Sequence, residues 1–286
     1  MSGSRIRKTL LDIGAVSEEN IELFSQSTRD RDIPVHIDAK SKVIFIQDFY
    51  VGDAEYVDAG YRDSYADDDD KSDTDRRVRE HFELYSGKRI LDFGFGGGSF
   101  LKAVLPKVRA CAGVELEERG KDFSRRTGIE THSSIEKLSF VPDVIFAFHV
   151  LEHLPDPLGW LGAMRDALPQ GGGTIVIEVP HALDFLLASL AVPEFKNYTL
   201  WSQHLVLHTR ESLSRLLSHA GFDVKEIYGV QRYGISNHFG WLSRRQPGSH
   251  HVAPFNGLKN EVLDSAYEAA LAASDSTDTL VLVATT

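Results

Sequence analysis

The chain has 286 residues, a formal net charge of −11 and one cysteine, and 42% of its residues are hydrophobic. This length and hydrophobic fraction fit one large α/β domain, with or without appendages, that buries a substantial core. The acidic charge argues against a nucleic-acid-binding protein, because affinity for nucleic acid comes mostly from neutralised phosphates. Cys111 alone forms no intramolecular disulfide. The N-terminus lacks the apolar core of a signal peptide, and no apolar run approaches the ~20 residues that span a bilayer. We therefore expect a cytoplasmic protein without membrane insertion.

The first 75 residues predict a hairpin and a segment that could act as a lid. Residues 1–16 look like a loosely held terminus, and Ser17 is placed to cap a short helix through Phe24. Two apolar runs that flank a polar turn, residues 35–37 and 43–46, predict a β-hairpin. The tyrosines that follow either anchor an irregular segment or reach a ligand, and ligand contact is considered mainly for Tyr61 and Tyr65.

The run of four aspartates at residues 67–70 is typical of a solvated, self-repelling loop rather than of a metal site. From Asp75 onward, apolar residues at helical spacing predict a helix that Gly87 ends.

Apolar runs typical of buried strands then alternate with amphipathic segments typical of helices. This alternation predicts an α/β fold with a mostly parallel sheet and helices on both faces. The expected helices follow Phe100, Asp156 and Thr209, and a further helix is expected near residues 258–272, after an irregular segment at 229–257. The expected strands lie near residues 90–92, 110–114, 129–132, 144–148, 174–179, 222–228 and 280–283.

The most informative stretch links the first of these strands to the helix that follows. Asp92 ends the strand, and glycines at 94, 96 and 98 form a loop against which a ligand can lie without a Cβ in the way. Glu115 ends the next strand, about 20 residues further on, where an acid accepts hydrogen bonds from both ribose hydroxyls of a nucleotide. The stretch therefore predicts a site for a nucleotide-like ligand. A surface glutamate in an acidic run is the other interpretation of Glu115.

The segment from Asp92 to Gly98 resembles the D-x-G-x-G-x-G loop of class I methyltransferases that depend on S-adenosylmethionine (SAM). Residues 149–157, read as HVLEHLPDP, resemble the segment after the fourth strand in the branch with ubiquinone-biosynthesis enzymes. The regions 169–180 and 211–224 also resemble that family, so the likeness covers roughly residues 85–228 and the last strand. The flanks resemble methyltransferases encoded with enzymes of surface-polysaccharide and modified-sugar synthesis.

The resemblance implies a Rossmann-like, seven-stranded methyltransferase sheet and SAM as the cofactor. We divide the chain into an N-terminal hairpin and lid (1–75), a SAM-binding core (76–228), an acceptor-site insertion (229–279) and the last strand (280–286). The expected cofactor residues are Asp92, Gly94, Phe95, Gly96, Gly98, Glu115, Leu116, His149, Tyr61 and Tyr65.

The acceptor is expected to lie beyond the carboxyl ends of the strands. His149 and His153, just past the fourth strand, are the first candidates for a general base, and His181 is a further candidate. The expected substrate-binding residues are Tyr198, His204, Arg232, Tyr233, Asn237 and His238. We predict methyl transfer to a small molecule, a sugar, nucleotide-sugar or related metabolite, with a quinone or phenol as the alternative. A homodimer is compatible with the sequence.

Three other functions were weighed against this prediction. A dinucleotide oxidoreductase needs G-x-G-x-x-G, but Ser99 stands at the third glycine. A zinc hydrolase would use the H-x-x-E-H pattern of His149, Glu152 and His153, yet that pattern needs a helix. His204 and His208 could form a metal pair, but we expect no metal. A SAM-binding scaffold without catalysis would keep the glycine loop and lose a usable acceptor site.

Overall fold

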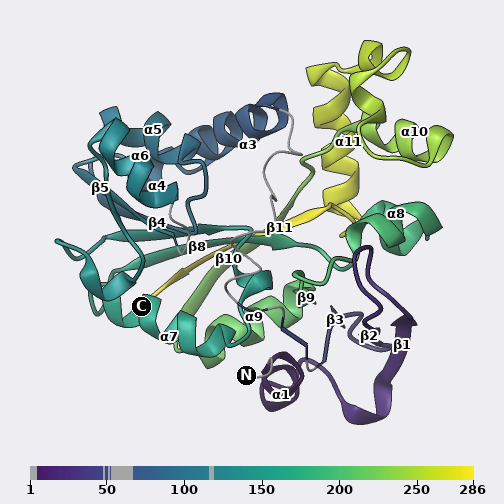
Figure 1. Cartoon of the computed structure of the whole chain (residues 1–286), viewed down its shortest axis with the longest axis horizontal. Coiled ribbons are helices and arrows are strands. Elements are labelled where there is room, and N and C mark those ends of the chain that lie inside the picture. Colours follow the sequence, from purple (N-terminus) through teal and green to yellow (C-terminus); the bar gives the residue numbers. More distant parts are fainter. Residues whose placement is uncertain (1–4, 48, 51, 53–66, 116–118) are drawn as a thin grey trace.

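The computed structural model describes residues 5–47, 49–50, 52, 67–115 and 119–286, and a seven-stranded sheet dominates this part of the chain (Figure 1). In their order across the sheet, the strands are β10 (Asp223–Val230), β11 (Thr279–Thr285), β8 (Thr174–Pro180), β7 (Val144–Phe148), β4 (Arg89–Phe93), β5 (Ala110–Val114) and β6 (Glu130–His132). Strands β8 to β6 are parallel, and β11 runs antiparallel between β8 and β10. The predicted Rossmann-like methyltransferase sheet is therefore confirmed.

Each face of this sheet buries its own apolar core. The upper core in Figure 1 joins side chains such as Ile90 and Phe146 to Tyr85, Phe100 and Phe123 of the covering helices. The lower core joins strand residues to α1, α7 and α9. The helices on the upper face are α3 (Asp67–Glu80), α4 (Phe82–Tyr85), α5 (Ser99–Val104) and α6 (Arg119–Thr127), and those on the lower face are α1 (Ile6–Asp12), α7 (Pro157–Ala167) and α9 (Arg210–His219). β7 is covered on both faces and is buried along its whole length. This is why all five of its residues, Val144–Phe148, are apolar.

A second, four-stranded antiparallel sheet lies beside the carboxyl ends of the main strands. Its strands, in order, are β1 (Ile21–Ser25), β2 (Val35–Asp38), β3 (Ile44–Phe45) and β9 (Val206–Leu207). Strands β2 and β3 form the predicted hairpin. Because β3 also pairs with β9, the N-terminal segment and the segment after β8 are joined in one sheet.

Two connections, from β8 to β9 and from β10 to β11, contain helical elements of their own. Between β8 and β9 lie η5 (Phe185–Ser189) and α8 (Pro193–Thr199), and between β10 and β11 lie α10 (Ile235–Arg244), η6 (Ser249–His251), η7 (Phe255–Leu258) and α11 (Glu261–Ala273). In Figure 1 these elements stand at the right-hand end of the sheet. The other short turns are η1 (Glu18–Asn20), η2 (Leu105–Lys107), η3 (Ile135–Lys137) and η4 (Leu151–His153).

Four local predictions were wrong. Residues 6–12 form α1 rather than a loose terminus, because Ile6 and Leu10 are buried in the lower core. The helix expected through Phe24 is the strand β1, which pairs with β2. The aspartates at 67–70 begin α3 instead of forming a loop, and α10 lies in a segment that we expected to be irregular.

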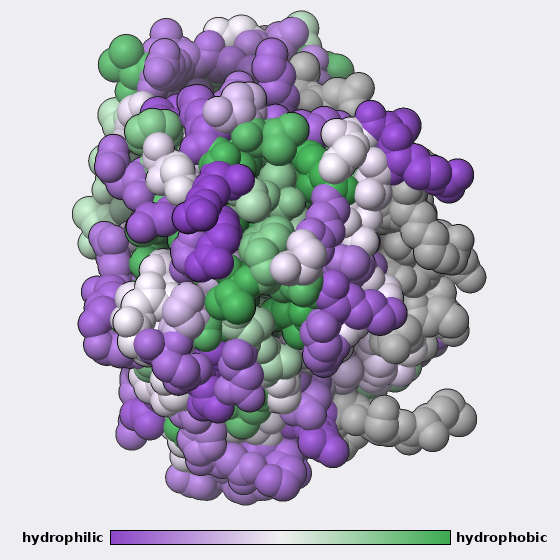
Figure 2. Space-filling view, turned by 90° about the vertical axis from the view of Figure 1, so that its left-hand side faces the viewer, coloured by the Kyte–Doolittle hydropathy of each residue, from purple (hydrophilic) through white to green (hydrophobic). Residues whose placement is uncertain are grey.

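The left-hand side of the molecule in Figure 1 carries an apolar hollow. Figure 2 faces the side on which α5, α6 and α7 lie, and hydrophobic residues form a patch there within hydrophilic surroundings. A hollow of about 550 Å³ lies between η3 and α7 and is lined by Leu138, Phe140 and Val141. It adjoins the start of β7, whereas ligands of open α/β sheets bind at the carboxyl ends of the strands.

The second residue of the glycine loop anchors that loop in the upper core. The Phe95 ring lies on Gly113 of β5, 5.1 Å from the ring of Phe123. A Cβ built at Gly113 would overlap the Phe95 ring. Gly113 thus makes room for an aromatic side chain where the loop leaves the sheet.

We predict that Gly113→Ala lowers the free energy of unfolding by about 1–3 kcal/mol, because Phe95 must move within a filled core. Gly162→Ala in α7 is the matched control, since a Cβ there meets nothing within 4 Å. That control should be neutral or stabilising by up to about 1 kcal/mol. Urea denaturation measures both variants, and equal effects of the two would contradict the packing role of Gly113.

Candidate active site

The loops that follow β4, β5, β7 and β8 meet at the carboxyl edge of the sheet, as open α/β sheets require of a ligand site. Residues 94–98 follow β4. Gly94 has a φ of 72°, and a Cβ there would overlap the side chain of Val150. The backbone N–H of Gly96 donates to Glu115 Oε2 over 2.9 Å. The glycine loop and the acid predicted to accompany it are therefore directly joined.

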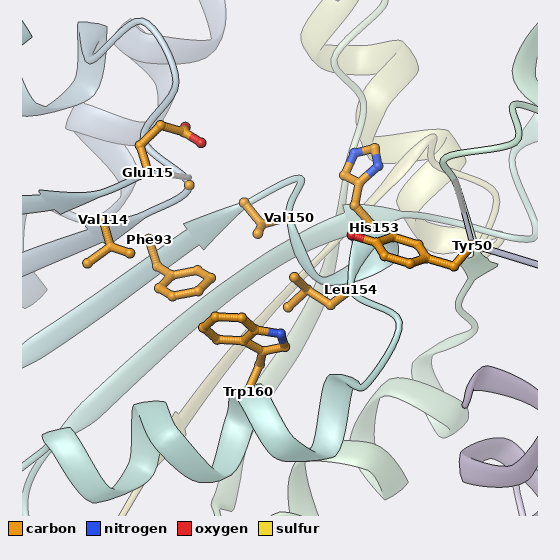
Figure 3. Close-up of a pocket in the computed structure, with 9 residues that line it drawn as sticks. Tyr50, Phe93, Val114, Glu115, Val150, His153, Leu154 and Trp160 are labelled. Carbon is orange, nitrogen blue, oxygen red and sulfur yellow. The ribbon is translucent and has the colours of Figure 1, made fainter. Parts of the chain in front are cut away.

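A narrow cavity of about 40 Å³ lies between this loop and the segment after β7 (Figure 3). Glu115 lies at one end of the group shown there, Tyr50 and His153 at the other, and the rings of Phe93 and Trp160 lie between them, 5.4 Å apart. Nucleoside-sized ligands fill several hundred Å³, so a ligand here must displace lining side chains. The lining comprises Tyr50, Phe93, Gly94, Val114, Glu115, Val150, His153, Leu154 and Trp160.

A second cavity, of about 640 Å³, lies beyond the first. Its wall combines aromatic rings, two arginines, histidines and aspartates from several parts of the chain, among them His149 after β7 and Asp278 before β11. The N-terminal segment contributes Arg29, the region between β8 and β9 contributes Asp184, Phe195, Tyr198, Trp201 and His204, and the insertion contributes Arg232, Tyr233, Asn237 and Trp241. This cavity is large enough for a small-molecule ligand.

His149 projects into the second cavity from an unusual backbone conformation. Its φ is 54°, in the left-handed region that non-glycine residues seldom adopt, and such residues cluster at functional sites. Its Nδ1 lies 3.3 Å from Glu152 Oε1, and 15% of its side chain is exposed. Burial, and then the nearby Arg232, hold the pKa of His149 well below its usual value, so the ring is neutral at neutral pH.

A buried ionic cluster supports this histidine. Glu178 in β8 is fully buried and accepts hydrogen bonds from Arg76 and Arg77 of α3. His149 Nε2 lies 4.0 Å from Glu178 Oε1. Burial alone would raise the pKa of Glu178, but the two guanidinium groups outweigh it and hold that pKa well below the usual range. The carboxylate is therefore charged.

The structure gathers most of the predicted residues around the two cavities. His153 lines the first cavity, and His149 lines the second together with five of the six predicted substrate residues, Tyr198, His204, Arg232, Tyr233 and Asn237. His238 lies behind the wall, buried between Gln231 and Tyr267.

The base role predicted for His181 does not agree with its position. The side chain is fully buried and lines neither cavity, and its Nδ1 donates to the carbonyl of Thr277.

Among the predicted cofactor residues, the side chain of Phe95 lies under the loop and Asp92 is buried inside the sheet. Leu116, Tyr61 and Tyr65 lie outside the described residues.

Sequence reasoning missed several members of the site. Arg29 and Trp201 are far apart in sequence but stack, with the guanidinium carbon 4.7 Å from the ring centroid. Glu178 carried a detectable signal, because an acid near the carboxyl end of an otherwise apolar strand points to a buried partner. Asp184 carried no such signal, since it lies in a loop beyond β8.

Comparison with known proteins decides the family. A family model described as a methyltransferase domain matches residues 62–227, which is more than half of the chain. The chain belongs to this methyltransferase family. The match spans the glycine loop, Glu115 and the segment after β7.

Individual relatives agree with this assignment. The ubiquinone biosynthesis O-methyltransferase of Marinobacter nauticus is 26% identical over 51% of this chain and 68% of its own length. The enzyme of the same description from Idiomarina loihiensis is 31% identical over 33% of this chain, a match that covers 44% of that relative. A chain from the Haloferax volcanii complex of the Trm112 methyltransferase activator and a methyltransferase shares the fold. Its TM-score is 0.51 at 15% identity, and the superposition covers 77% of this chain and 94% of that one.

The protein is a SAM-dependent methyltransferase, as the glycine loop predicted. The residues around the first cavity suit its cofactor in their chemistry, and their side chains must move apart to admit it. Gly94 lines this cavity, and Glu115, whose Oε2 accepts from the Gly96 N–H, would hold the ribose hydroxyls of SAM there. SAM supplies an activated methyl group, so the chain mainly has to orient it. Within the described residues, every helix is too short or too polar to cross a membrane.

We predict that Glu115→Gln weakens SAM binding about tenfold or more, since a hydrogen bond to a charged acceptor contributes ~1.5–3 kcal/mol. The glutamine keeps an oxygen for the Gly96 N–H and removes only the charge. Isothermal titration calorimetry measures the change. Glu83→Gln, on the exposed side of α4, is the control, and equal affinities in the two variants would argue against the ribose role.

Asp184 gives the site a pH-dependent element. Its carboxylate accepts hydrogen bonds from the backbone N–H groups of Leu186 and Leu187, at 2.7 and 3.0 Å. Burial, and then the neighbouring Asp278, raise the pKa of Asp184 from 3.8 to about 7. At a pH between these two pKa values, Asp184 is more fully protonated in the folded chain than in the unfolded chain. This group therefore lowers the free energy of unfolding as the pH rises through that window.

We predict that Asp184→Asn removes this dependence. The free energy of unfolding of the variant, relative to the parent, should rise by up to ~1.4 kcal/mol per pH unit between about pH 5 and 7 and level off above. Urea denaturation at a series of pH values measures it. Asp166→Asn, an exposed control on α7, should follow the parent at every pH, and a parallel profile for Asp184→Asn would refute the assignment.

Proposed function

We propose that this enzyme transfers the methyl group of SAM to a polar small molecule bound in the second cavity, and that a sugar or nucleotide-sugar is the acceptor. The observation that carries the proposal is the composition of the cavity wall, in which flat aromatic rings alternate with arginines and hydrogen-bonding side chains. Aromatic faces cover the apolar faces of a sugar, and arginines pair with phosphate.

Two arginines favour an anionic group in the acceptor. The guanidinium of Arg29 stacks on Trp201 and donates to the carbonyl of Tyr198 over 3.2 Å. Arg232 is held against Asp73 of α3, with its Nε 2.8 Å from Asp73 Oδ2. Arg29 is the exposed member of the two, so a phosphate on the acceptor would meet it first.

A phenol or quinone precursor is the second candidate, and the relatives named as ubiquinone biosynthesis O-methyltransferases support it. The phenol ring would lie against the same aromatic wall. A quinone precursor with a long apolar chain would need a continuous apolar groove. The wall of the second cavity instead includes charged side chains, among them Arg29, Asp184 and Arg232.

The transfer itself is a direct displacement. A nucleophilic atom of the acceptor attacks the methyl carbon, the bond from that carbon to sulfur breaks, and the electron pair stays on the sulfur. An acceptor hydroxyl also loses a proton. We assign its removal to His149, whose neutral ring reaches the cavity, with His153 as the alternative.

The test is mass spectrometry of reactions with SAM and a panel of nucleotide-sugars, free sugars, quinone precursors and small phenols. We expect a product one methylene heavier from a nucleotide-sugar, and an Arg29→Ala variant that raises its KM about tenfold with little change in kcat. Arg215→Ala on α9 is the control, because that arginine pairs only with Glu211 at the surface among the described residues.

Two other results of this experiment would each indicate a different function. Methylation of phenols alone would replace the sugar by the second candidate. SAM binding without methyl transfer to any member of the panel would favour a non-catalytic SAM-binding scaffold.

A further inference from the structure

A side-chain cluster lies in the wall between the two cavities. Glu152 and His153 end the short turn η4, and His204 comes from the loop before β9. One potential ligand atom from each of these three side chains lies within 4.8 Å of the other two. His153 lines the first cavity and His204 the second, so the cluster lies where the two cavities adjoin.

We propose that Glu152, His153 and His204 bind one divalent transition-metal ion, with remaining coordination positions that face the second cavity. Two imidazoles and a carboxylate are a donor set that suits zinc and its first-row neighbours. Bonds of about 2.0–2.2 Å hold the ligand atoms of one ion roughly 3–4.4 Å apart. Small side-chain rotations therefore suffice to close the site.

Glu152 supplies the independent evidence for a cation. Its side chain is fully buried, and neither carboxylate oxygen has a hydrogen-bond partner in another described residue. The nearest ring nitrogens are His149 Nδ1 at 3.3 Å and His153 Nε2 at 3.8 Å. A buried carboxyl without partners is rare, and a metal ion would provide the missing one.

The two histidines are oriented as metal ligands usually are. His153 Nδ1 donates to the carbonyl of Gln203 over 2.8 Å, which leaves the lone pair of the neutral ring on Nε2, the nitrogen that faces Glu152. The ring of His204 donates to the backbone of Thr199, and its Nδ1 is buried without a partner among the described residues. The rings of the two histidines lie 5.0 Å apart.

The backbone fixes the two ligand-bearing segments to each other. The N–H of Leu205 donates to the carbonyl of Glu152 over 2.8 Å, and the N–H of His204 donates to Trp201. Ser202 is tied to Asp30 of the N-terminal segment through both its N–H and its hydroxyl. A preorganised set of this kind loses little entropy on binding an ion.

The expected role rests on the proposed function. A metal in this wall would bind an oxygen of the acceptor and ease loss of its proton, which passes to His149 or to water. The oxygen then forms its bond to the methyl carbon as the bond from carbon to sulfur breaks. Metal binding itself requires neither SAM nor an acceptor, so it can be tested when no acceptor is known.

The experiment is isothermal titration of the untagged, chelator-treated full chain with Zn²⁺, Mn²⁺ and Mg²⁺, with the metal content of the dialysed protein measured by mass spectrometry. We expect one Zn²⁺ per chain and weaker binding of Mg²⁺. Glu152→Gln and His204→Asn should each weaken the Zn²⁺ affinity about 100-fold or more. His219→Asn, which removes an exposed histidine at the end of α9, should leave it unchanged.

SAM affinity, measured on the same variants, separates loss of the metal from loss of the fold. An unchanged SAM affinity in His204→Asn together with lost Zn²⁺ binding supports the proposal. Absence of stoichiometric binding, or Zn²⁺ binding that both ligand variants retain, overturns it. Zinc binding without methylation of any acceptor would leave the metal site standing and refute the proposed function instead.

Discussion

One buried carboxylate holds together the elements that form the site. Glu178 lies inside the main sheet, and both of its oxygens accept hydrogen bonds from consecutive arginines of α3. Removal of one partner of a buried ion pair leaves an uncompensated charge and destabilises a protein by about 3–5 kcal/mol. Arg77 also lies over the ring of Phe148, 4.3 Å from its centroid. The first helix of the core is thereby fixed to the carboxyl edge of β8 by charge as well as by apolar contact.

The same network of charges extends to the wall of the second cavity. Asp73, one turn before Arg76 in α3, accepts from Arg232, and the backbone N–H groups of Arg232 and Tyr233 donate to Asp278 at the start of β11. The wall of the second cavity is therefore tied to the helix that Glu178 positions. These ion pairs and hydrogen bonds hold the backbone that carries the aromatic rings of the second cavity. The rings are therefore in position before a ligand binds.

The core was predictable because its signals are local. Strands β4, β5, β7, β8 and β11 each have their own apolar run. The glycine loop and Glu115 follow adjacent strands, β4 and β5, whose parallel pairing brings them together. The N-terminal errors have one physical reason. A short segment such as Ile21–Ser25 becomes a strand only because β2 offers it a partner, and α1 is stable only because the lower core covers Ile6. Neither partner is visible within the segment itself.

Most residue types in the wall of the second cavity were predicted, but the way in which distant segments assemble that wall was not. Arg29, His149, His204 and Arg232 meet because β3 pairs with β9 and because the insertion returns to the sheet at β11. The H-x-x-E-H pattern shows the limit most clearly. We set it aside because two histidines four residues apart share a face only on a helix. The fold instead turns His149 into a left-handed conformation and brings His204 beside His153 from another loop. Two residues of a motif can therefore meet a donor from another loop even where the motif fails in its usual geometry, and three-dimensional proximity of donors is the better criterion for a candidate metal site.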